Sequence, residues 1–253
     1  KSVLVYGNPN CDTHVINEPY NPLIKNPDFS FKMDLKTDFN FLMVSQLTDV
    51  SSDRDRKNIL NTISAFCETF KDDKNVGLIV KTNLGRSTMK DRKITQDLLS
   101  DIIKKERKSN FPKVYLVHGL LSPNEMSAIY NHKSVKGLIS LTRGEGYGLP
   151  LLEASVSSLP VIATNWSGHL DFLTDFVKIK YNIINIPDSK ADGRMFQKGM
   201  KWADPDIEDF KLKIKDFKEN YKTYKKSAKK LASTNSAKFS QKSFNNIMNE
   251  IIR

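Results

Sequence analysis

Two glutamates, Glu145 and Glu153, stand eight positions apart along a glycine-rich turn that runs into a predicted helix. Glycines let backbone N–H groups approach an anion closely, and the positive end of a helix dipole favours a phosphate. Carboxylate oxygens accept hydrogen bonds from sugar hydroxyl groups. Without the glycines, we would interpret both glutamates as acidic residues at a helix start, where a negative charge interacts favourably with the helix dipole. With them, residues 142–154 predict a site for a ligand that carries phosphates and hydroxyls.

Short apolar runs alternate with helical patterns on both sides of this turn. The predicted strands are residues 41–44, 76–80, 113–117, 137–141, 160–164 and 177–180. The predicted helices are residues 56–70, 94–105, a helix opened by Ser122 and Pro123, and 148–156. This alternation predicts the α/β class with a Rossmann-like, doubly wound parallel sheet, in which ligands bind at the carboxyl ends of the strands.

The two ends of the chain differ from this middle part. Residues 1–36 are rich in proline and predict a hinge or linker with short strands at 3–6 and 13–16, followed by a single domain over residues 37–253. Apolar residues spaced three or four apart predict one long amphipathic helix over 207–231 and a last helix over 241–252. The chain begins with Lys1 and shows no signal or transit peptide, so we expect a fragment of a longer, cytoplasmic protein.

Composition excludes several classes of protein. With 253 residues, 39% hydrophobic and 27% charged, the chain is not collagen-like, disulfide-rich or wholly disordered. No apolar run approaches the roughly 18 residues of a membrane span. Cys11 and Cys67 are predicted to be reduced thiols, and the four histidines show no metal-ligand spacing.

Positive charge is concentrated near the C-terminus. Residues 211–242 hold eleven lysines against Asp216 and Glu219, and so carry +9 of the formal net charge of +11. A solvated helix face is the simplest interpretation, and peripheral attachment to an anionic membrane surface is the alternative. The segment lacks arginine and base-stacking aromatic residues interleaved with its lysines, so we expect no nucleic-acid partner.

The glycine-rich turn resembles a known family. Gly-Glu-Gly-Tyr-Gly-Leu-Pro-Leu-Leu-Glu-Ala at 144–154, Leu-Pro-Val-Ile-Ala-Thr at 159–164 and Ser-Gly-His-Leu-Asp-Phe-Leu at 167–173 resemble the donor-binding domain of retaining GT-B glycosyltransferases. The most similar group is glycosyltransferase family 4, also called glycosyl transferases group 1. Arg56-Lys57-Asn58 and Gly119-Leu120-Leu121-Ser122 fit the same pattern.

The resemblance implies a role for each matching position. Glu153 would hold the ribose hydroxyls of a nucleotide diphosphate sugar, and Glu145 would lie near the donor sugar. Arg56 and Lys57 would neutralise the diphosphate, with Glu145, Arg56 and Lys57 forming the catalytic set. The remaining predicted donor-binding positions are Gly146, Tyr147, Gly148, Leu149, Lys81, His118, Gly119 and Gly168.

Some positions depart from the family or allow two interpretations. Gln46 stands where many members carry arginine, Ser158 where glycine is common, and Thr142 where serine is common. The Asp53-Arg54-Asp55 triplet matches a metal-binding Asp-x-Asp pattern, but its place in a polar loop before a helix favours a solvated loop or helix-start charges.

Four other side chains are ambiguous. His169 either contacts a ligand or packs within its loop, and the same two interpretations apply to His118. For Trp166 and Trp202 we favour packing, the latter between the domain and the C-terminal segment.

Together these features predict the donor-binding half of a retaining, metal-independent glycosyltransferase without a bound cofactor. Its acceptor would be a sugar, a lipid-linked sugar or a protein, and an acceptor domain would come from the same or another chain. Two alternatives stay open: a sugar-nucleotide epimerase or phosphorylase of the same fold, and a non-catalytic module that docks on an anionic membrane.

Overall fold

The computed structural model describes residues 14–49, 51–83, 86–107 and 109–252. Its main sheet has six parallel strands in the order β3-β2-β1-β4-β5-β6. The strands are β1 (Phe39–Val44), β2 (Val76–Thr82), β3 (Lys113–His118), β4 (Val135–Ser140), β5 (Val161–Thr164) and β6 (Val177–Ile179). Every predicted strand of the sheet is therefore confirmed, as is the Rossmann-like class.

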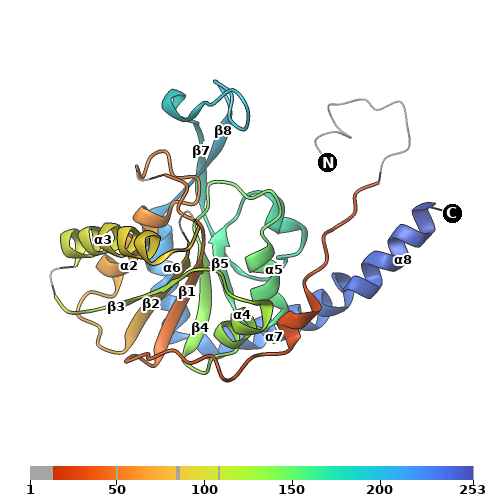
Figure 1. Cartoon of the computed structure of the whole chain (residues 1–253), viewed down its shortest axis with the longest axis horizontal. Helices are drawn as coiled ribbons and strands as arrows, with labels where there is room; N and C mark the ends of the chain where they lie inside the picture. The colour runs from red at the N-terminus through yellow and green to blue at the C-terminus, as the bar shows by residue number, and fades with distance from the viewer. Residues whose placement is uncertain (1–13, 50, 84–85, 108, 253) are drawn as a thin grey trace.

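Helices cover both faces of the sheet (Figure 1). One face carries α2 (Ile59–Thr69), α3 (Met89–Glu106) and α6 (Ile207–Glu219). The other carries α4 (Pro123–Tyr130), α5 (Leu149–Val156) and α7 (Tyr221–Lys238). Capping boxes start α3 at Thr88 and α4 at Ser122, because each hydroxyl accepts a backbone N–H three residues on.

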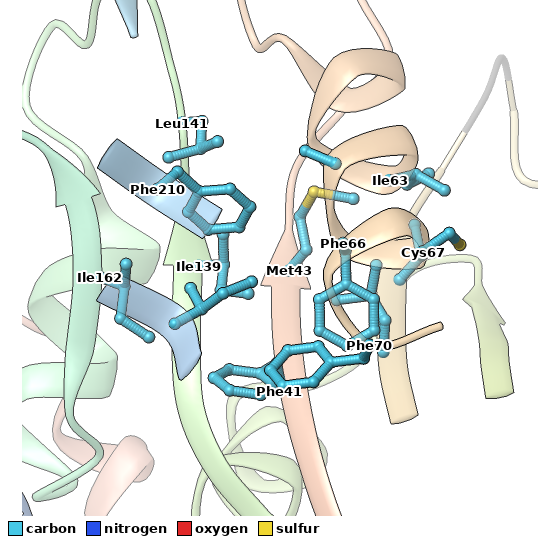
Figure 2. Close-up of a cluster of buried hydrophobic side chains, with 14 of the residues drawn as sticks. Phe41, Met43, Ile63, Phe66, Cys67, Phe70, Ile139, Leu141, Ile162 and Phe210 are labelled. Carbon is cyan, nitrogen blue, oxygen red and sulfur yellow. The ribbon is translucent and has the colours of Figure 1, made fainter. Parts of the chain in front are cut away.

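Aromatic side chains fill the core beneath α2 and α6. Phe41 of β1 is fully buried and packs against Phe66, Phe70 and Phe217, with ring centroids 5.5–5.6 Å apart. Figure 2 shows Phe41, Phe66 and Phe70 between β1 and α2. Burial raises the pKa of the neighbouring Cys67 thiol to about 11, which suits a free, unreactive cysteine.

The N-terminal segment packs on the domain and contains no strand in its described part. Residues 14–16 of the predicted strand at 13–16 are irregular, while Cys11 and the predicted strand at 3–6 lie outside the described residues. A short 3-10 helix, η1 (Pro22–Lys25), buries Ile24 completely. Tyr20 donates its backbone N–H to Phe239 O at 3.1 Å, so this segment contacts the end of α7.

The predicted long C-terminal helix is two helices, because α6 ends at Glu219 and α7 starts at Tyr221. Asn220 adopts φ −103° and ψ 24° at the break, and its amide donates to Asp216 Oδ1 at 2.7 Å. The predicted last helix is confirmed as α8 (Gln241–Ile252), which extends away from the sheet (Figure 1).

An antiparallel hairpin that the sequence did not predict precedes α6. Its strands are β7 (Tyr181–Asn185) and β8 (Lys201–Pro205), and it projects from the body of the domain (Figure 1). The 3-10 helix η3 (Asp188–Lys190) lies in the loop between β7 and β8, and another, η2 (Gly168–Asp171), lies between β5 and β6.

Candidate functional site

The strand order places a crevice between β1 and β4. The chain passes from β1 outward to β2 and β3, and then returns to the other side of β1 as β4. In open parallel sheets, ligands bind where the strand order reverses, at the carboxyl ends of the strands. Arg56 and Lys57 follow β1 and Glu145 follows β4, so all three predicted catalytic residues lie at this switch point.

The Glu145 carboxylate binds both cations of the loop before α2. Its Oε1 lies 2.5 Å from Lys57 Nζ, and its Oε2 lies 3.8 Å from Arg56 Nη1. Arg56 also donates to the Gly144 carbonyl. The helix predicted over 56–70 begins only at Ile59, after Asn58 in the left-handed conformation. That later start leaves both cationic side chains on a loop that reaches the turn after β4.

Asp55 fixes this cationic loop rather than presenting a free carboxylate. It is fully buried, and its Oδ2 accepts the Ile59 N–H at 2.7 Å while Oδ1 accepts the Thr48 hydroxyl at 2.6 Å. Asp55 is therefore a helix-start residue, whereas Asp53 accepts a hydrogen bond from the Ser51 hydroxyl in the exposed loop before it. Among the described residues, no three His, Cys, Asp or Glu side chains are grouped as a metal site.

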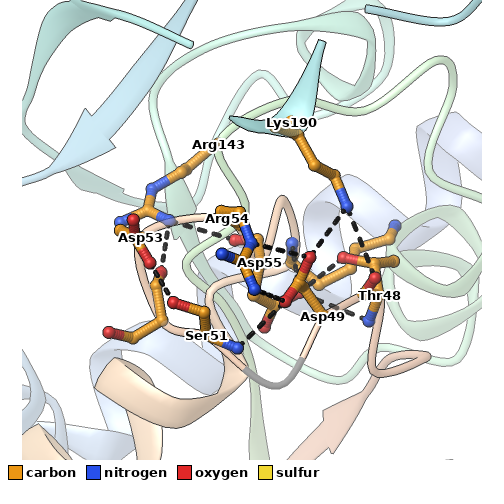
Figure 3. Close-up of polar contacts among 10 residues, drawn as sticks. Thr48, Asp49, Ser51, Asp53, Arg54, Asp55, Arg143 and Lys190 are labelled. Atoms are coloured by element: carbon orange, nitrogen blue, oxygen red, sulfur yellow. Dashed lines mark hydrogen bonds and ion pairs between the residues drawn. The ribbon is translucent and has the colours of Figure 1, made fainter. Parts of the chain in front are cut away.

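Arg143 joins the turn after β4 to the cationic loop (Figure 3). Only 4% of it is exposed, and its Nη1 donates to Ser52 O at 2.6 Å and Asp55 O at 3.1 Å. Its other nitrogens bind Asp204 of β8, and the guanidinium lies over the Trp202 ring. Trp202 is thus packed as predicted, although against Arg143 and Phe196 rather than the C-terminal helices. Sequence reasoning missed Arg143, whose neighbour Gly144 opens the motif.

The glycine-rich turn rests on the loop after β5. Ser167 Oγ accepts the Glu145 N–H at 2.8 Å and donates to Glu145 O at 2.6 Å. A Cβ at Gly168 would lie 2.0 Å from Gly146 O, so no other residue fits without moving the turn. Gly168, predicted to border the donor sugar, supports the turn from beneath. Ser167 was missed because one serine in a loop carries no signal on its own.

Helix α5 starts without a side-chain cap. Gly148 is its N-cap with φ 96°, a conformation that glycine adopts without steric cost, and Leu149 is the first helical residue. Pro150 carries no N–H, and Leu151 donates its N–H to Gly148 O at 2.9 Å. The Leu149 N–H is therefore the group of this first turn that is suited to bind an anion. Tyr147 turns away from this end, since its hydroxyl donates to Glu18 O at 2.8 Å and its ring packs on Phe172.

Glu153 lies on α5 and points toward α4. Its Oε2 accepts the Tyr130 hydroxyl at 3.0 Å. Burial raises the pKa of the Glu153 carboxyl, and the hydrogen bond from Tyr130 opposes part of that rise. Tyr130 is a positioning residue that the sequence reasoning missed.

Lys81 and His118 meet at the ends of β2 and β3. Lys81 Nζ donates to the Gly119 carbonyl at 2.7 Å, and burial lowers its pKa. Burial also lowers the pKa of His118, whose Nε2 has no hydrogen-bond partner among the described residues. The β2–β3 loops are thereby held together at the same edge of the sheet as Glu145.

His169 lies beneath the turn in the buried interior. Its Nε2 contacts Thr164 O at 2.8 Å, it is 0% exposed, and burial lowers its pKa. A neutral imidazole therefore packs under Gly148, which agrees with the packing interpretation of this residue.

The sheet, its helices and this crevice are those of one half of a GT-B glycosyltransferase. A family model described as Glycosyl transferases group 1 matches residues 52–233, which is more than half of the chain. The chain therefore belongs to the glycosyl transferases group 1 family. No curated protein sequence matches it.

Solved structures show the same fold at low sequence identity. The C-terminal domain of a group 1 glycosyl transferase (LpcC) from Francisella tularensis is 16% identical with a TM-score of 0.56, and the match covers 92% of this chain and 100% of that domain. Sucrose-phosphate synthase from Thermosynechococcus elongatus is 14% identical with a TM-score of 0.66, covering all of this chain and 55% of that protein. HepE from Anabaena, solved with UDP and glucose, is 15% identical with a TM-score of 0.64, covering 95% and 56%.

This chain therefore spans little more than half the length of the two larger structures. Within the described residues, none of the helices combines the length and the apolar character that a bilayer-spanning segment requires.

Proposed function

We propose that this domain binds a nucleotide diphosphate sugar across the β1–β4 crevice and transfers the sugar to an acceptor hydroxyl with retention and without a metal ion. The observation that carries the proposal is the cluster of Lys57, Arg56 and Glu145 beside the uncapped start of α5. Two cations against one carboxylate leave a net positive site, which suits a diphosphate.

The chemistry assigns a task to each part of the crevice. As the bond between the sugar C1 and the diphosphate oxygen breaks, negative charge grows on the diphosphate, where Arg56, Lys57 and the Leu149 N–H stabilise it. The acceptor oxygen attacks the same face of C1, and its proton passes to a diphosphate oxygen. Glu153, presented between α5 and α4, holds the ribose hydroxyls.

A further domain would complete the cleft from the other side and orient the acceptor. Two longer structures support this part of the proposal. The chain spans 55% of sucrose-phosphate synthase and 56% of HepE.

A thermal-shift panel of UDP-, GDP- and ADP-sugars tests donor binding, because a ligand that binds only the folded state raises the melting temperature. At least one sugar nucleotide should raise it, and Glu153→Ala should abolish that rise. A full rise in the Glu153→Ala variant would refute the site. Analysis of the products formed from the donor alone separates transfer from epimerisation.

The basic helix face supports a second proposal, peripheral attachment to an anionic membrane. Three of the four lysines of α6 are compensated, since Lys211, Lys213 and Lys218 each pair with an acid. Helix α7 contains six lysines and no acid. Burial lowers the pKa of Lys225, and the positive charges of Lys229 and Lys136 lower it further.

Sedimentation with anionic and neutral vesicles tests this attachment. The chain should co-sediment only with anionic vesicles, and reversing the charge of exposed Lys226, Lys229 and Lys230 should release it. Reversal of Lys104 and Lys105 on α3 is the control. Equal release by both sets would contradict a specific α7 surface.

A further inference from the structure

A hollow of about 530 Å³ opens beside Glu145, on the side of the β7–β8 hairpin. Its polar lining includes Arg56 and Glu145 of the crevice, together with Arg143, Ser167 and Lys201. Its apolar lining comes from the loop after β5 and from the hairpin. The apolar lining consists of Trp166, Ile186, Met195, Phe196, Met200 and Trp202.

Three of these six apolar side chains are open to solvent, whereas Ile186 and Trp202 are buried at the base of the lining. Met195 is 68% exposed, Met200 is 45% exposed and Trp166 is 36% exposed. Flexible methionines and flat aromatic rings side by side are typical of surfaces that bind apolar ligands of variable shape. The volume lies within the roughly 300–1,000 Å³ of small-molecule sites.

Polar contacts hold the hairpin loop over the crevice. Lys190 binds Asp49 Oδ2 and Thr48 O, both at 3.4 Å, so the loop is tied to the segment before α2 (Figure 3). Asp192 Oδ1 accepts the backbone N–H groups of Met195 and Phe196 at 2.8 and 3.0 Å. These hydrogen bonds fix the conformation of the turn that presents the two side chains. The apolar surface of the turn therefore has a defined shape beside the site.

We propose that this hollow binds the acceptor, and that the acceptor is amphipathic, with a hydroxyl-bearing head and an apolar tail. The inference rests on the proposed function, because that function places the transferred sugar at Glu145. The hydroxyl head lies beside Arg56 and Glu145, where its oxygen can reach the donor. The tail lies along the uncharged side chains of Met195, Phe196 and Met200, and Lys201 is the one hairpin cation that also lines the hollow. A free sugar without a tail would leave this surface uncovered.

Tryptophan fluorescence tests the proposal directly, because the chain has only two tryptophans and both line the hollow. The chain would be titrated with methyl, octyl and phenyl β-glucoside below their aggregation concentrations. We expect octyl or phenyl glucoside to shift the emission and to bind at least tenfold more tightly than methyl glucoside. The two tailed probes distinguish an alkyl from an aromatic tail.

A double variant, Met195→Ser with Met200→Ser, should weaken binding of the tailed probe about tenfold or more, since each tenfold corresponds to about 1.4 kcal/mol of lost apolar burial. The matched control is Leu212→Ser, which removes a 70% exposed apolar side chain on α6. It should leave binding unchanged. Equal binding of all three glucosides, or wild-type binding by the double variant, would overturn the proposal.

The two proposals fail in different ways. The double variant should keep the melting-temperature rise with sugar nucleotides, which depends on Glu153 and not on the hairpin. If the tailed glucosides bind but no sugar nucleotide does, the glycosyl-transfer proposal fails alone. If sugar nucleotides bind and the double variant instead abolishes self-association of the chain, the hollow is covered by a second copy and the acceptor proposal is wrong.

Discussion

The Lys57 ammonium lies 2.5 Å from the Glu145 carboxylate, although 88 positions separate the two residues in the chain. The pair is largely shielded from water, with 17% of the Lys57 side chain and 10% of the Glu145 side chain exposed. The cation proposed to meet a diphosphate is therefore already engaged by a carboxylate, and an incoming phosphate must compete for it.

This competition predicts opposite effects for the two partners. Lys57→Met should weaken binding of a nucleoside diphosphate about 10-fold to 100-fold, because a charge-assisted hydrogen bond contributes about 1.5–3 kcal/mol. Glu145→Gln should bind the same ligand at least as tightly as the wild type, since it frees Lys57. Isothermal titration calorimetry measures both. Equal weakening in the two variants would mean that Glu145 orients Lys57 for the phosphate rather than competing with it.

Glu153 should lower stability at neutral pH. Its pKa in the folded protein is raised above the ordinary 4.5, so the free energy of unfolding falls as the pH rises from 4.5 through that higher value. Glu153→Gln removes this loss while keeping an acceptor for Tyr130. We expect the variant to melt a few degrees above the wild type at pH 7. Just below pH 4.5 the difference in melting temperature should be smaller. Calorimetry at the two pH values checks this, and a gain independent of pH would contradict it.

Gly168 should tolerate no side chain, whereas Gly144 should accept one. A Cβ at Gly168 would lie 2.0 Å from Gly146 O, while one at Gly144 would meet nothing within 4 Å. Gly168→Ala should cost about 1–3 kcal/mol and reduce donor binding, because the turn must move. Gly144→Ala should stay within about 0.5 kcal/mol of the wild type. Urea midpoints report the difference, and equal midpoints would disprove the close packing.

Arg143 should stabilise the fold through the hydrogen bonds of its guanidinium more than through its positive charge. Replacing it by Met removes the donor to the buried Asp55 carbonyl and to the half-buried Ser52 carbonyl, and should cost about 2–3 kcal/mol. Arg143→Lys should recover little, because an ammonium cannot reproduce the planar fork. Arg54→Met, which breaks a more exposed pair with Asp49, is the control and should cost about 1 kcal/mol or less. If the two methionine variants unfold at the same urea concentration, Arg143 does not join the loops as described.

The sheet was predictable because a parallel strand covered on both faces is a continuous apolar run. Residues 76–80 illustrate this, since every residue of β2 is buried. The β7–β8 hairpin gave no such signal. Residues 182–185 of β7 are all exposed, so their mixed sequence follows neither a buried nor an alternating pattern.

The break at Asn220 was missed for a different reason. The apolar spacing continues from α6 into α7, but Phe217 packs on one face of the sheet and Leu231 packs on the other. A periodic pattern reports only that a helix has an apolar side. It does not report which surface that side covers, so one helix and two helices give the same pattern.

By itself the sequence determined the six parallel strands, the helices between them, and the glycine-rich turn with Glu145 and Glu153, because burial patterns and turn residues act over a few neighbouring positions. Only the tertiary structure decided that Lys57 meets Glu145, that Tyr130 holds Glu153, and that Met195 and Met200 line a hollow beside them. Those contacts join segments that parallel strand pairing brings together at one edge of the sheet, and no local pattern specifies which side chains then touch.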